Sequence, residues 1–570
     1  MCGIFGFTAT GRSAAACEAE LAAMSQTLLH RGPDATGYCR DNFLAMGMNR
    51  LAIIDLDKRA NQPLYSADGR YAIVYNGEIY NYREVREALE STYTFETASD
   101  TEVLLYTFID GGIDGLNRLN GMFAFCIYDL QECCFYLGRD RLGVKPLYYA
   151  HTGDRVVFAS EMKAILQHVP MAASDIDPRS EAYYLIYEAV PEPATLFKGV
   201  RMVEAGTVLR VDAELGETTE RYWRLPPLAP DEGMREEDAV ATVREILEDA
   251  VRIRLRSDVD VGIFLSGGID STLVAAIAAR LHPGLRSFSI GYDDTRHDES
   301  VYAEATAHFL GLEHHTLKID PRNGDEGLLD SVADALVANV TFIPYLRLSE
   351  YAARYVKVAL NGDGGDEFFC GYSTLGRVAA ILRIRGQVPS WLWKGLLRLL
   401  GPLYRRLKLP KSWVVDILDF DSPEELLALF QAKSDKETFR KTLDGYGFPD
   451  AYRLPCNPCT FQELNYLQAA TFLPNTVLKT ADMATMAFSL EGRSPLLDYR
   501  LIEFAATIPE SLHTKGGESK YILKKVLENY MPRELFDRPK KGFSVPISDL
   551  RAFRTALLAR FKARYLERQP

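Results

Sequence analysis

The chain has 570 residues, 47% of them hydrophobic, and a formal net charge of −13. At roughly 100–200 residues per domain, this length predicts two to four domains with cores of ordinary size. The acidic balance argues against a nucleic-acid partner, because phosphate binding requires a basic face. There is no apolar run of the ~18–20 residues that span a bilayer and no leader-like start, so we expect a cytoplasmic protein without a transmembrane segment.

The N-terminal run MCGIFG places Cys2 directly behind the initiator methionine. Removal of that methionine would leave an α-amine and a thiol on the same residue. An α-amine with a pKa near ~7.7–8 is partly neutral at physiological pH, so it can accept the thiol proton directly or through a water. Cys2 is therefore a candidate nucleophile with its own base. The alternative is a small buried apolar residue, the usual state of a free cysteine.

Short strand-like segments separated by turn signals follow Cys2 and continue to near residue 225. Tight turns at Asp68-Gly69 and Thr152-Gly153-Asp154, between β-rich flanks, predict hairpins. We therefore expect layered antiparallel sheets with a few helices in this half. The next stretch, RLPPLAPDEGMREED, is rich in proline and charge and predicts a linker.

Beyond the linker, strand, glycine loop and helix alternate, which predicts a parallel α/β sheet. The clearest unit is DVGIFLSGGIDSTLVAAIAARL, where an apolar strand enters Ser266-Gly267-Gly268 and a helix follows. Such a turn presents backbone N–H groups to phosphate oxygens at a helix N-terminus. The Gly-Lys-Ser/Thr of a Walker A loop is absent. An ordinary strand-to-helix turn is the alternative.

A second loop of glycines and acids, NGDGGDE at 361–367, follows another apolar strand. Loops at the carboxyl ends of parallel strands meet at one edge of the sheet, so we expect the two loops to converge across a crevice. Magnesium prefers oxygen ligands and commonly bridges to phosphates. Asp270 and Asp366 are therefore candidates to share one Mg²⁺.

The motifs together resemble a known family. MCGIFG, RGPD, RLAIID, NGEIYN and Ser99-Asp100 resemble the class II, N-terminal-nucleophile (Ntn) glutamine amidotransferases. SGGIDS, NGDGGDE, DMATMAFSLEGRSPLLD and RPKKGF resemble the ATP-pyrophosphatase half of glutamine-hydrolysing asparagine synthetases. The resemblance covers nearly the whole chain. It implies an αββα Ntn-type antiparallel sandwich at 1–215, a linker at 216–240, and a doubly wound parallel sheet with helical additions at 241–570.

The resemblance also implies the reaction. Aspartate, glutamine and ATP would give asparagine, glutamate, AMP and pyrophosphate through a β-aspartyl-AMP intermediate, with Mg²⁺ as cofactor. Ammonia would travel inside the protein, so we expect an apolar passage between the two halves. The partners are then small-molecule substrates, and a homodimer is left open as the oligomeric state.

The family's functional residues carry over to matching positions of this chain. Cys2 would attack glutamine, with Asn76 and Gly77 as the oxyanion hole, and Lys540 would neutralise charge during adenylation. The implied glutamine-binding residues are Arg50, Leu51, Ala52, Ile53, Ile54, Asn76, Gly77, Glu78 and Asp100. The implied ATP-binding residues are Leu265, Ser266, Gly267, Gly268, Asp270, Ser271, Ile290, Asn361 and Gly362. Asp270 and Asp366 match the metal carboxylates. Arg493 and Lys520 are open between phosphate or acceptor contacts and structural ion pairs.

One position departs from the family pattern. Where typical asparagine synthetases have SGEGSDE this chain has NGDGGDE, so Asp363 stands in place of the glutamate implied in acceptor activation. The carboxylate is kept but is one methylene shorter. An amidotransferase acting on another carboxylate, in a polysaccharide or specialised-metabolite pathway, is therefore the alternative function.

A segment at 386–413 carries tryptophans and leucines edged by lysines and arginines. The pattern is typical of a helix with one apolar face. We favour a helical insertion that covers the synthetase site; contact with an anionic membrane surface is the second interpretation.

Overall fold

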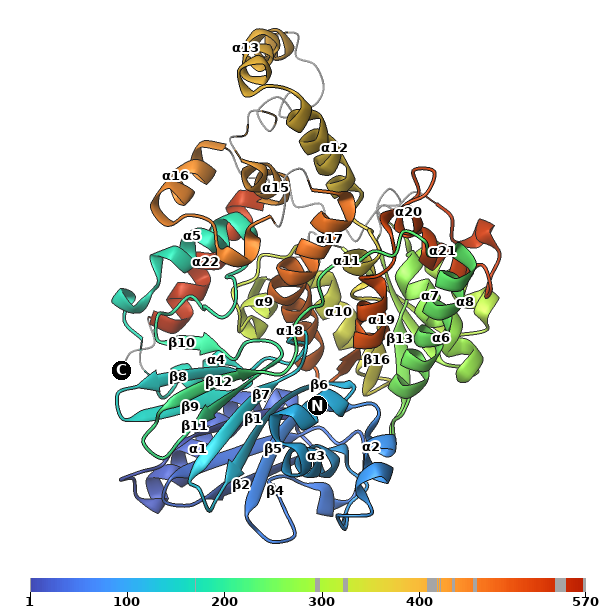
Figure 1. Ribbon diagram of the computed structural model, residues 1–570. Coiled ribbons are helices and arrows are strands. Elements are labelled where there is room, and N and C mark those ends of the chain that lie inside the picture. The colour runs from blue at the N-terminus through green and yellow to red at the C-terminus, as the bar shows by residue number, and fades with distance from the viewer. Residues whose placement is uncertain are drawn as a thin grey trace.

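The structure is a computed structural model that describes residues 2–169, 171–292, 298–320, 326–406, 418, 420, 422–432, 436–454, 459–538 and 550–566. Two antiparallel sheets of the first half lie at one end of the molecule, and the parallel sheet with most of the helices lies above them (Figure 1). Within the described residues, no helix is both long and apolar enough to cross a membrane.

The first half is a four-layer sandwich, as expected. One sheet comprises, in spatial order, β10 (Val200–Met202), β8 (Tyr148–Thr152), β9 (Arg155–Ala159), β1 (Cys2–Thr8), β3 (Leu44–Arg50) and β2 (Ala35–Arg40). The other comprises β12 (Glu217–Arg221), β11 (Thr207–Val211), β7 (Cys134–Arg139), β6 (Gly121–Asp129), β5 (Tyr71–Ile79) and β4 (Leu64–Tyr65). Helices α1 (Ala14–Leu28) and α4 (Met162–Leu166) contact the first sheet, while α3 (Asp100–Gly115) lies against β5 of the second and α2 (Tyr82–Leu89) contacts α3.

Apolar side chains fill the space between these two sheets. Ile4 and Met46 from the first sheet pack with Val74, Ala124 and Phe135 from the second in one buried cluster. The inner strands β1 and β3 are buried at every position, because a sheet or a helix covers each of their faces. Their apolar runs therefore place the N-terminal residue Cys2 at the edge of a rigid core.

The second sheet continues past the expected boundary at residue 215. Its last strand, β12, pairs antiparallel with β11, and all five of its side chains are exposed. The strand-like segments expected up to near residue 225 include this strand, but its sequence ETTER is exposed and has no apolar alternation, so it does not mark the end of the sheet. The helix after the linker, α6, covers Glu236–Arg254 and begins inside the expected linker.

The second half contains a five-stranded parallel sheet, which confirms the expected fold class. Its spatial order is β15 (Glu313–Ile319), β14 (Arg286–Tyr292), β13 (Val261–Phe264), β16 (Val358–Leu360) and β17 (Glu491–Arg493). Ile263 and Leu265 pack in a cluster with α6 and α7 (Ile269–Leu281), whereas Phe264 packs in a cluster with α10 (Phe342–Ala352). Helices thus cover both faces of the sheet.

Further helices surround this sheet. They are α8 (Ser300–Leu310), α9 (Glu326–Val332), α11 (Gly365–Phe368), α12 (Ser373–Gln387), α13 (Ser390–Arg406), α15 (Pro423–Ala432), α16 (Lys436–Tyr446), α17 (Phe461–Ala470), α18 (Leu478–Met486), α19 (Tyr499–Ala505), α20 (Glu510–His513), α21 (Tyr521–Leu527) and α22 (Leu550–Leu566). Helix α5 (Pro178–Tyr187) of the first half contacts α15 and α16.

The segment at 386–413 does not have the position that we favoured. Helix α12 begins close after α11, which follows the second acid loop, and its 15 residues extend about 22 Å outward. Helix α13 lies beyond it at the tip of the molecule (Figure 1). α13 therefore extends away from the carboxyl edge of the parallel sheet instead of covering it; residues 407–413 lie outside the described residues.

Shared apolar clusters join the two halves. One cluster combines Phe5 and Tyr184 of the first half with Leu346 and Leu557 of the second. Another combines Tyr80 of the first half with Val358 of β16 and Met486 of α18. Because buried apolar side chains of both halves belong to the same clusters, the interface has the apolar character of a core.

Candidate functional site

Cys2 lies at the start of β1, directly opposite Arg50 on β3. Its residue is only 5% exposed, and its backbone nitrogen donates a hydrogen bond of 2.8 Å to Oδ1 of Asn76 on β5. Burial raises the pKa of the Cys2 thiol, and the Leu51 backbone amide and the Arg50 charge oppose that rise. The backbone nitrogen of this cysteine is therefore fixed by an asparagine of the facing sheet.

Asn76 has a free donor next to Cys2. Its side-chain Nδ2 is buried and has no hydrogen-bond partner among the described residues. At the next position, a Cβ on Gly77 would lie 2.2 Å from the Met122 carbonyl oxygen, so only glycine lets β5 run this close to β6. A buried amide donor without a partner is suited to an oxygen that gains negative charge.

A pocket opens beside Cys2, within the first half. It is lined by Cys2, Arg50, Leu51, Ile53, Ile54, Gln62, Tyr75, Gly77, Glu78, Ser99, Asp100 and Thr101. The lining includes every expected glutamine-binding residue except Ala52 and Asn76. The side chain of Asn76 instead contacts Cys2. The amide of Ala52 donates to Asp34 Oδ2 at 2.9 Å. The structure thus brings most of the expected set together in one pocket.

Four lining residues were missed by the sequence reasoning. Gln62 Nε2 donates to Thr101 Oγ1 at 3.1 Å, and Tyr75 donates its hydroxyl to Asp100 Oδ2 at 2.8 Å. Ser99, the fourth, caps α3 by accepting from the Thr101 amide. Tyr75 directly precedes the NGEIYN motif, and Ser99 and Thr101 flank Asp100, so neighbourhood in the chain was the available signal. Gln62 lies in a loop without a motif.

Arg50 also shapes the wall of this pocket. Its guanidinium donates to the carbonyl oxygens of Ile54 at 3.2 Å and Asp57 at 3.1 Å, and to Asn61 Oδ1 at 2.7 Å. Asp55 between them has the left-handed φ of 54°. The arginine therefore stabilises a loop conformation that a non-glycine residue rarely adopts.

The second half of the chain supplies a charge behind the pocket. Arg493 on β17 is fully buried and lies 2.6 Å from Glu491 Oε1 and 3.2 Å from Glu78 Oε2. Burial raises the pKa of Glu78, with Asp100 adding to the rise and Arg493 opposing it. For Arg493 the structure thus gives a structural ion pair between the halves, which was one of the two roles left open.

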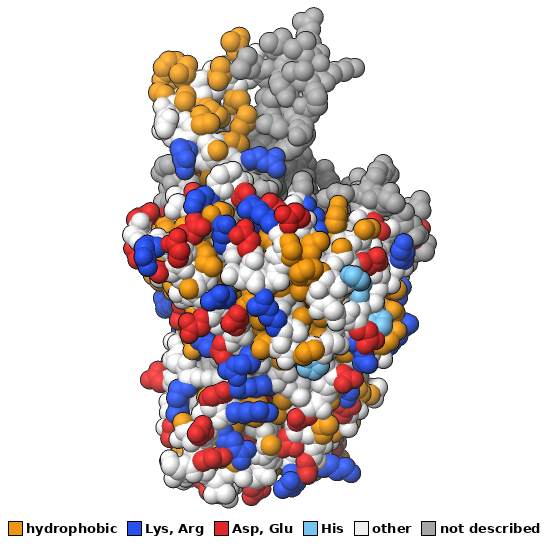
Figure 2. Space-filling model, turned by 90° about the vertical axis from the view of Figure 1, so that its right-hand side faces the viewer, with side chains coloured by type: hydrophobic (Ala, Val, Ile, Leu, Met, Phe, Trp, Pro, Cys, Tyr) orange, Lys and Arg blue, Asp and Glu red, His pale blue; other side chains and the backbone are white. Residues whose placement is uncertain are grey.

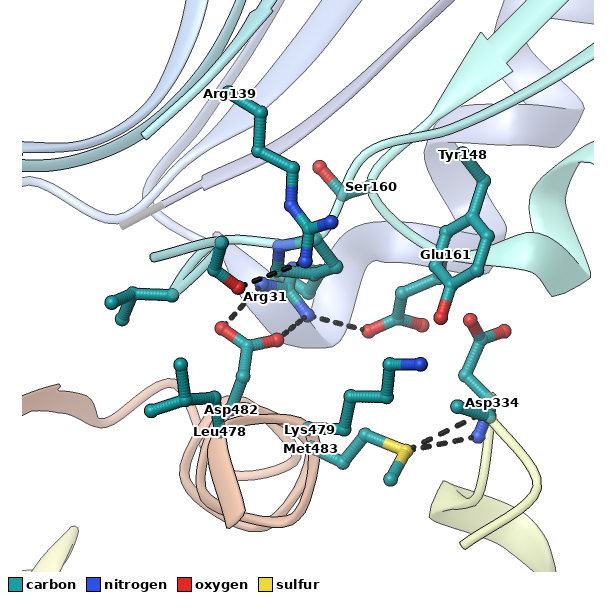
Figure 3. Close-up of a pocket in the computed structure, with 14 residues that line it drawn as sticks. Arg31, Arg139, Tyr148, Ser160, Glu161, Asp334, Leu478, Lys479, Asp482 and Met483 are labelled. Carbon is teal, nitrogen blue, oxygen red and sulfur yellow. Dashed lines mark hydrogen bonds and ion pairs between the residues drawn. The ribbon is translucent and has the colours of Figure 1, made fainter. Parts of the chain in front are cut away.

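A buried ion-pair cluster joins the halves next to Cys2 (Figure 3). Arg31 Nη1 lies 2.9 Å from Glu161 Oε1 and 2.9 Å from Asp482 Oδ2, and Arg31 Nε donates to the Cys2 carbonyl at 3.3 Å. Lys145 Nζ lies 3.2 Å from Asp482 Oδ1. Burial alone would raise the pKa of Asp482, but the charges of Arg31 and Lys145 hold it below its usual value.

The cluster borders a cavity of about 20 Å³, large enough for one water or one ammonia. Its lining includes Arg31, Arg139, Tyr148, Ser160, Glu161, Asp334, Leu478, Lys479, Asp482 and Met483. Apolar side chains of both halves, including Val144, Leu478 and Met483, also line it beside the ion pairs. Such pairs hold their geometry only while both halves are in place. The apolar passage that we expected between the halves stays a prediction.

The first loop of the second half adopts the expected strand–turn–helix geometry. It connects β13 to α7 and has Gly267 at a φ of +75°. Ser266 Oγ lies 2.9 Å from Ser271 Oγ and accepts from the Gly268 amide at 3.2 Å. Ile290 is buried on the neighbouring strand β14. The loop is therefore held open at the N-terminus of α7, where backbone N–H groups attract anions.

The two acid loops converge, as expected from the parallel sheet. A Cβ on Gly362 would lie 2.7 Å from the Ser271 amide nitrogen, and one on Gly365 would lie 2.4 Å from Asp270 Cγ. The side chain of Asn361 donates to the Tyr345 hydroxyl at 3.1 Å. Glycine is thus required where the second loop passes over the start of α7.

Lys520 joins the two expected metal carboxylates. Its Nζ lies 2.6 Å from Asp366 Oδ1 and also contacts Asp270 Oδ2. Burial alone would lower the pKa of this lysine, but the two carboxylates raise it. The described residues contain no group of three or more metal-ligating side chains. A divalent ion at this pair would therefore take its other ligands from phosphate and water, which is the coordination that magnesium prefers.

Asp363 is buried beside this pair. Burial, with smaller contributions from Asp270 and Asp366, raises its pKa to about 7. Its Oδ2 has no hydrogen-bond partner among the described residues. A carboxyl with a pKa near neutrality can both accept and release a proton at physiological pH.

Lys540 of RPKKGF lies outside the described residues. Arg538 of the same motif is described, and it was missed. Its guanidinium donates to the Gly267 carbonyl and lies 3.9 Å from the centre of the Tyr302 ring. A positive charge therefore lies on the glycine loop, and its place in the motif was the signal for it.

Comparison with known families matches both halves. The family model described as asparagine synthase matches residues 242–569, more than half of the chain, and the glutamine amidotransferase domain matches residues 1–223. The chain belongs to the asparagine synthase family. Members of this family use ATP as a substrate.

Similar proteins cover nearly the whole chain. An asparagine synthetase [glutamine-hydrolyzing] 1 of Bacillus subtilis (strain 168) is 36% identical over 92% of this chain and 83% of its own. A putative asparagine synthetase [glutamine-hydrolyzing] of Mycobacterium bovis is 33% identical over 96% of this chain and 88% of its own. The amidase chyE of Penicillium rubens is 28% identical over 91% of this chain and 83% of its own.

Proposed function

We propose that this asparagine synthase family member is a glutamine-hydrolysing asparagine synthetase. Beside the family match, one structural observation carries the proposal. Cys2, whose nitrogen donates to Asn76, lies in one half, and the loops of Asp270 and Asp366 converge in the other. The first arrangement suits release of ammonia from an amide, and the second suits activation of a carboxylate by a nucleotide.

In the proposed glutaminase step, the Cys2 thiol attacks the side-chain amide carbon of glutamine. The thiol proton passes to the α-amine that removal of Met1 would expose and from there to the departing nitrogen, so that ammonia leaves as the thioester forms. Water then hydrolyses the thioester, which gives glutamate and restores the thiol. The open Nδ2 donor of Asn76 supports a role in stabilising the tetrahedral oxyanion. Arg50 and Asp100 line the same pocket, which supports their roles at the carboxylate and the amine of glutamine.

In the proposed synthetase step, the aspartate side-chain carboxylate attacks the α-phosphorus of ATP and pyrophosphate leaves. The residues from Leu265 to Ser271 would hold the nucleotide, because their loop lies at the N-terminus of α7, where backbone N–H groups attract anions. Mg²⁺ at Asp270 and Asp366 would neutralise phosphate charge. Asp363, with a pKa of about 7, would take the proton released when ammonia attacks the adenylate. Lys540 would stabilise the charge developed during adenylation.

Product analysis tests this function. The purified chain is incubated with aspartate, glutamine, ATP and Mg²⁺, and asparagine, glutamate, AMP and pyrophosphate are quantified. We expect asparagine, AMP and pyrophosphate in equal amounts. ADP with phosphate, or glutamate without AMP, would contradict the proposal. The N-terminus is checked by mass spectrometry, because active protein that retains Met1 would exclude the nucleophile.

A second candidate is the same chemistry on another carboxylate. The observation in its favour is the Asp363 carboxyl, which is shorter by one methylene than the glutamate of typical asparagine synthetases. The shorter Asp363 side chain would leave more room for the acceptor, and its carboxyl would reach less far toward it. A panel of carboxylic acids, scored by AMP formation without and with glutamine, distinguishes the two: a preferred acceptor other than aspartate favours the second candidate.

The remaining parts of the proposal concern location, assembly and division. Cys17, Cys126 and Cys134 are buried as free thiols, which supports the cytoplasm, a reducing compartment. We keep the division into a glutaminase part, a linker and a synthetase part, with the first boundary after β12 because that strand completes the second sheet. A homodimer stays an expectation, which sedimentation of the purified chain tests.

A further inference from the structure

The extension formed by α12 and α13 differs in charge from the rest of the chain. The net charge of the whole chain is −13, yet residues 373–406 include no aspartate or glutamate. They include seven basic residues, which are Arg377, Arg383, Arg385, Lys394, Arg398, Arg405 and Arg406. A strongly cationic segment on an acidic protein points to a negatively charged partner.

Helix α13 also exposes a row of large apolar side chains. Their exposed fractions are 75% for Trp391, 48% for Leu392, 47% for Leu396 and 74% for Leu399. At about 100° per residue, the four side chains fall within one sector of about 140° around the helix. Lys394 and Arg398, both exposed, lie beside this sector on the Trp391 side. The outward face is therefore an apolar stripe with a cationic border.

The inward face of α13 is attached to the protein. Trp393 donates its indole N–H to the Leu418 carbonyl at 3.0 Å, and the Arg385 guanidinium of α12 lies 6.0 Å from its ring centre. Leu397 lies one turn further along the same face and is half-buried. These contacts set the rotation of the helix, so the exposed stripe is not its packing face.

The stripe lies where a flat surface can reach it. Helix α13 is at the tip of the molecule, at the end opposite the two antiparallel sheets (Figure 1). Apolar side chains gather on this tip in the space-filling view, beside residues that are not described (Figure 2). A planar partner could therefore contact α13 without meeting the glutamine pocket.

We propose that α13 docks on the surface of an anionic phospholipid bilayer. The apolar stripe enters the boundary between headgroups and acyl chains, with the Trp391 ring at the headgroup level, and Lys394 and Arg398 contact lipid phosphates. A uniformly negative surface suits the exposed cations Lys394 and Arg398 beside the apolar stripe, in a segment whose sequence has no acidic residue. This docking is independent of the proposed reaction.

Vesicle flotation tests the docking with the full chain. Vesicles of pure phosphatidylcholine are compared with vesicles that contain 30% phosphatidylglycerol, at low and at high salt. We expect co-flotation with the anionic vesicles, a loss of binding at high salt, and little binding to pure phosphatidylcholine. Each cation near the surface strengthens binding by about fivefold, so Lys394→Glu with Arg398→Glu should weaken it by well over tenfold.

Matched variants separate docking from general surface effects. Leu399→Glu should abolish binding, because a carboxylate enters the apolar stripe; Leu281→Glu, at a 46% exposed leucine at the end of α7, should not change it. Asparagine synthesis should be equal in all of these variants, which shows that they fold. Absence of binding to anionic vesicles, or equal binding by Leu399→Glu, would overturn the docking. The docking would also be overturned if the unchanged chain does not bind vesicles but forms a dimer that Leu399→Glu converts to a monomer. The stripe would then be a contact between two copies of the chain.

Discussion

The glutamine pocket and the crevice between the two acid loops both bury carboxylates, but they balance them differently. In the pocket, Glu78 is paired with Arg493, and Asp100 accepts hydrogen bonds from Tyr75 and from the Ile79 amide at 2.9 Å. In the crevice, Lys520 contacts two carboxylates at once, and Asp363 beside them has a pKa raised to about 7. In the pocket, each of these two carboxylates thus has a partner from the protein, whereas at the two loops three carboxyl groups lie around one lysine, which suits them to receive further cations.

The difference fits the chemistry proposed for each region. A cysteine nucleophile needs fixed donors and a fixed amine, and preorganised donors act without rearrangement at the moment of reaction. Adenylation brings in a triphosphate with its metal, so the charge of that region changes as substrate binds. The lysine between Asp270 and Asp366 then acts as the counter-charge of the substrate-free state.

The largest expected effect is that of Cys2→Ala, which should abolish activity with glutamine and leave activity with ammonia unchanged. Cys2→Ala removes the proposed nucleophile, so glutamine-dependent AMP formation should fall by about 10⁴-fold or more. AMP formation with ammonium chloride should stay within about twofold, because the crevice is untouched. Cys17→Ala, at a buried thiol of α1, serves as the control and should keep both activities. Equal loss with both nitrogen sources would break the comparison.

Asn76→Ala sharpens the account of the pocket. It removes the open Nδ2 donor, so kcat for glutamine hydrolysis should fall by about 10²–10³ with little change in KM. Asn61→Ala is the matched change: it removes a 2.7 Å contact of Arg50 and should raise KM for glutamine more than it lowers kcat. Steady-state glutamate production gives both constants. A rise in KM alone for Asn76→Ala would argue against an oxyanion donor.

Lys520→Met tests the counter-charge in the crevice. Removing one partner from a buried ion cluster is strongly destabilising, so the substrate-free variant should lose about 3–5 kcal/mol of stability. Mg²⁺ should raise the Tm of the variant more than that of the unchanged chain, since it can replace the missing ammonium. Lys525→Met, whose 2.9 Å partner Glu528 is on the surface, should change stability by less than about 1 kcal/mol. An equal Mg²⁺ response in both chains would contradict this role for Lys520.

Asp363→Asn should change stability less than Lys520→Met does, and it should stabilise the protein. The pKa is about 7 in the folded chain against 3.8 for an ordinary aspartate, so unfolding releases a proton between about pH 4 and pH 7. The contribution of this carboxyl is therefore present at low pH and lost as the pH rises through 7. Above pH 7 the asparagine variant should be more stable than the unchanged chain by about 2–4 kcal/mol.

Urea unfolding at pH 5, 7 and 8.5 measures this difference. The gain of Asp363→Asn should shrink steadily toward pH 5, because ionisation of the carboxyl favours the unfolded chain less as the pH approaches the ordinary pKa of 3.8. A gain that is constant with pH would show that the Asp363 carboxyl does not titrate in this range.

Sequence reasoning reached the architecture and the centre of both sites. Strand-like runs and glycine loops predicted the antiparallel layers, the parallel sheet and the convergence of the two loops. Cys2, Asn76 and Asp100 lie together because β5 contacts both β1 and α3. Local pattern predicted the sheets and the two loops, whereas the expected roles of Asn76 and Asp100 came from the family resemblance.

The contacts between the halves were out of reach. Arg493 contacts Glu78, and Arg31 contacts Asp482, across more than 400 positions of chain. Such pairs have no periodicity or spacing, and their partners are decided only when two folded surfaces dock. Gln62 lies in the pocket for a similar reason, since its loop is held by contacts with Thr101 and Tyr75.

The cluster around Arg31 limits how this protein can be taken apart or recombined. An isolated first half would leave Arg31 without Asp482, and an isolated second half would leave Asp482 without Arg31 and Lys145. Engineered chimeras that exchange one half for that of a distant relative would therefore have to transplant α18 and the Arg31 turn together. The set of residues that has to be exchanged as one unit is therefore the ion-pair cluster at the interface, not either catalytic half alone.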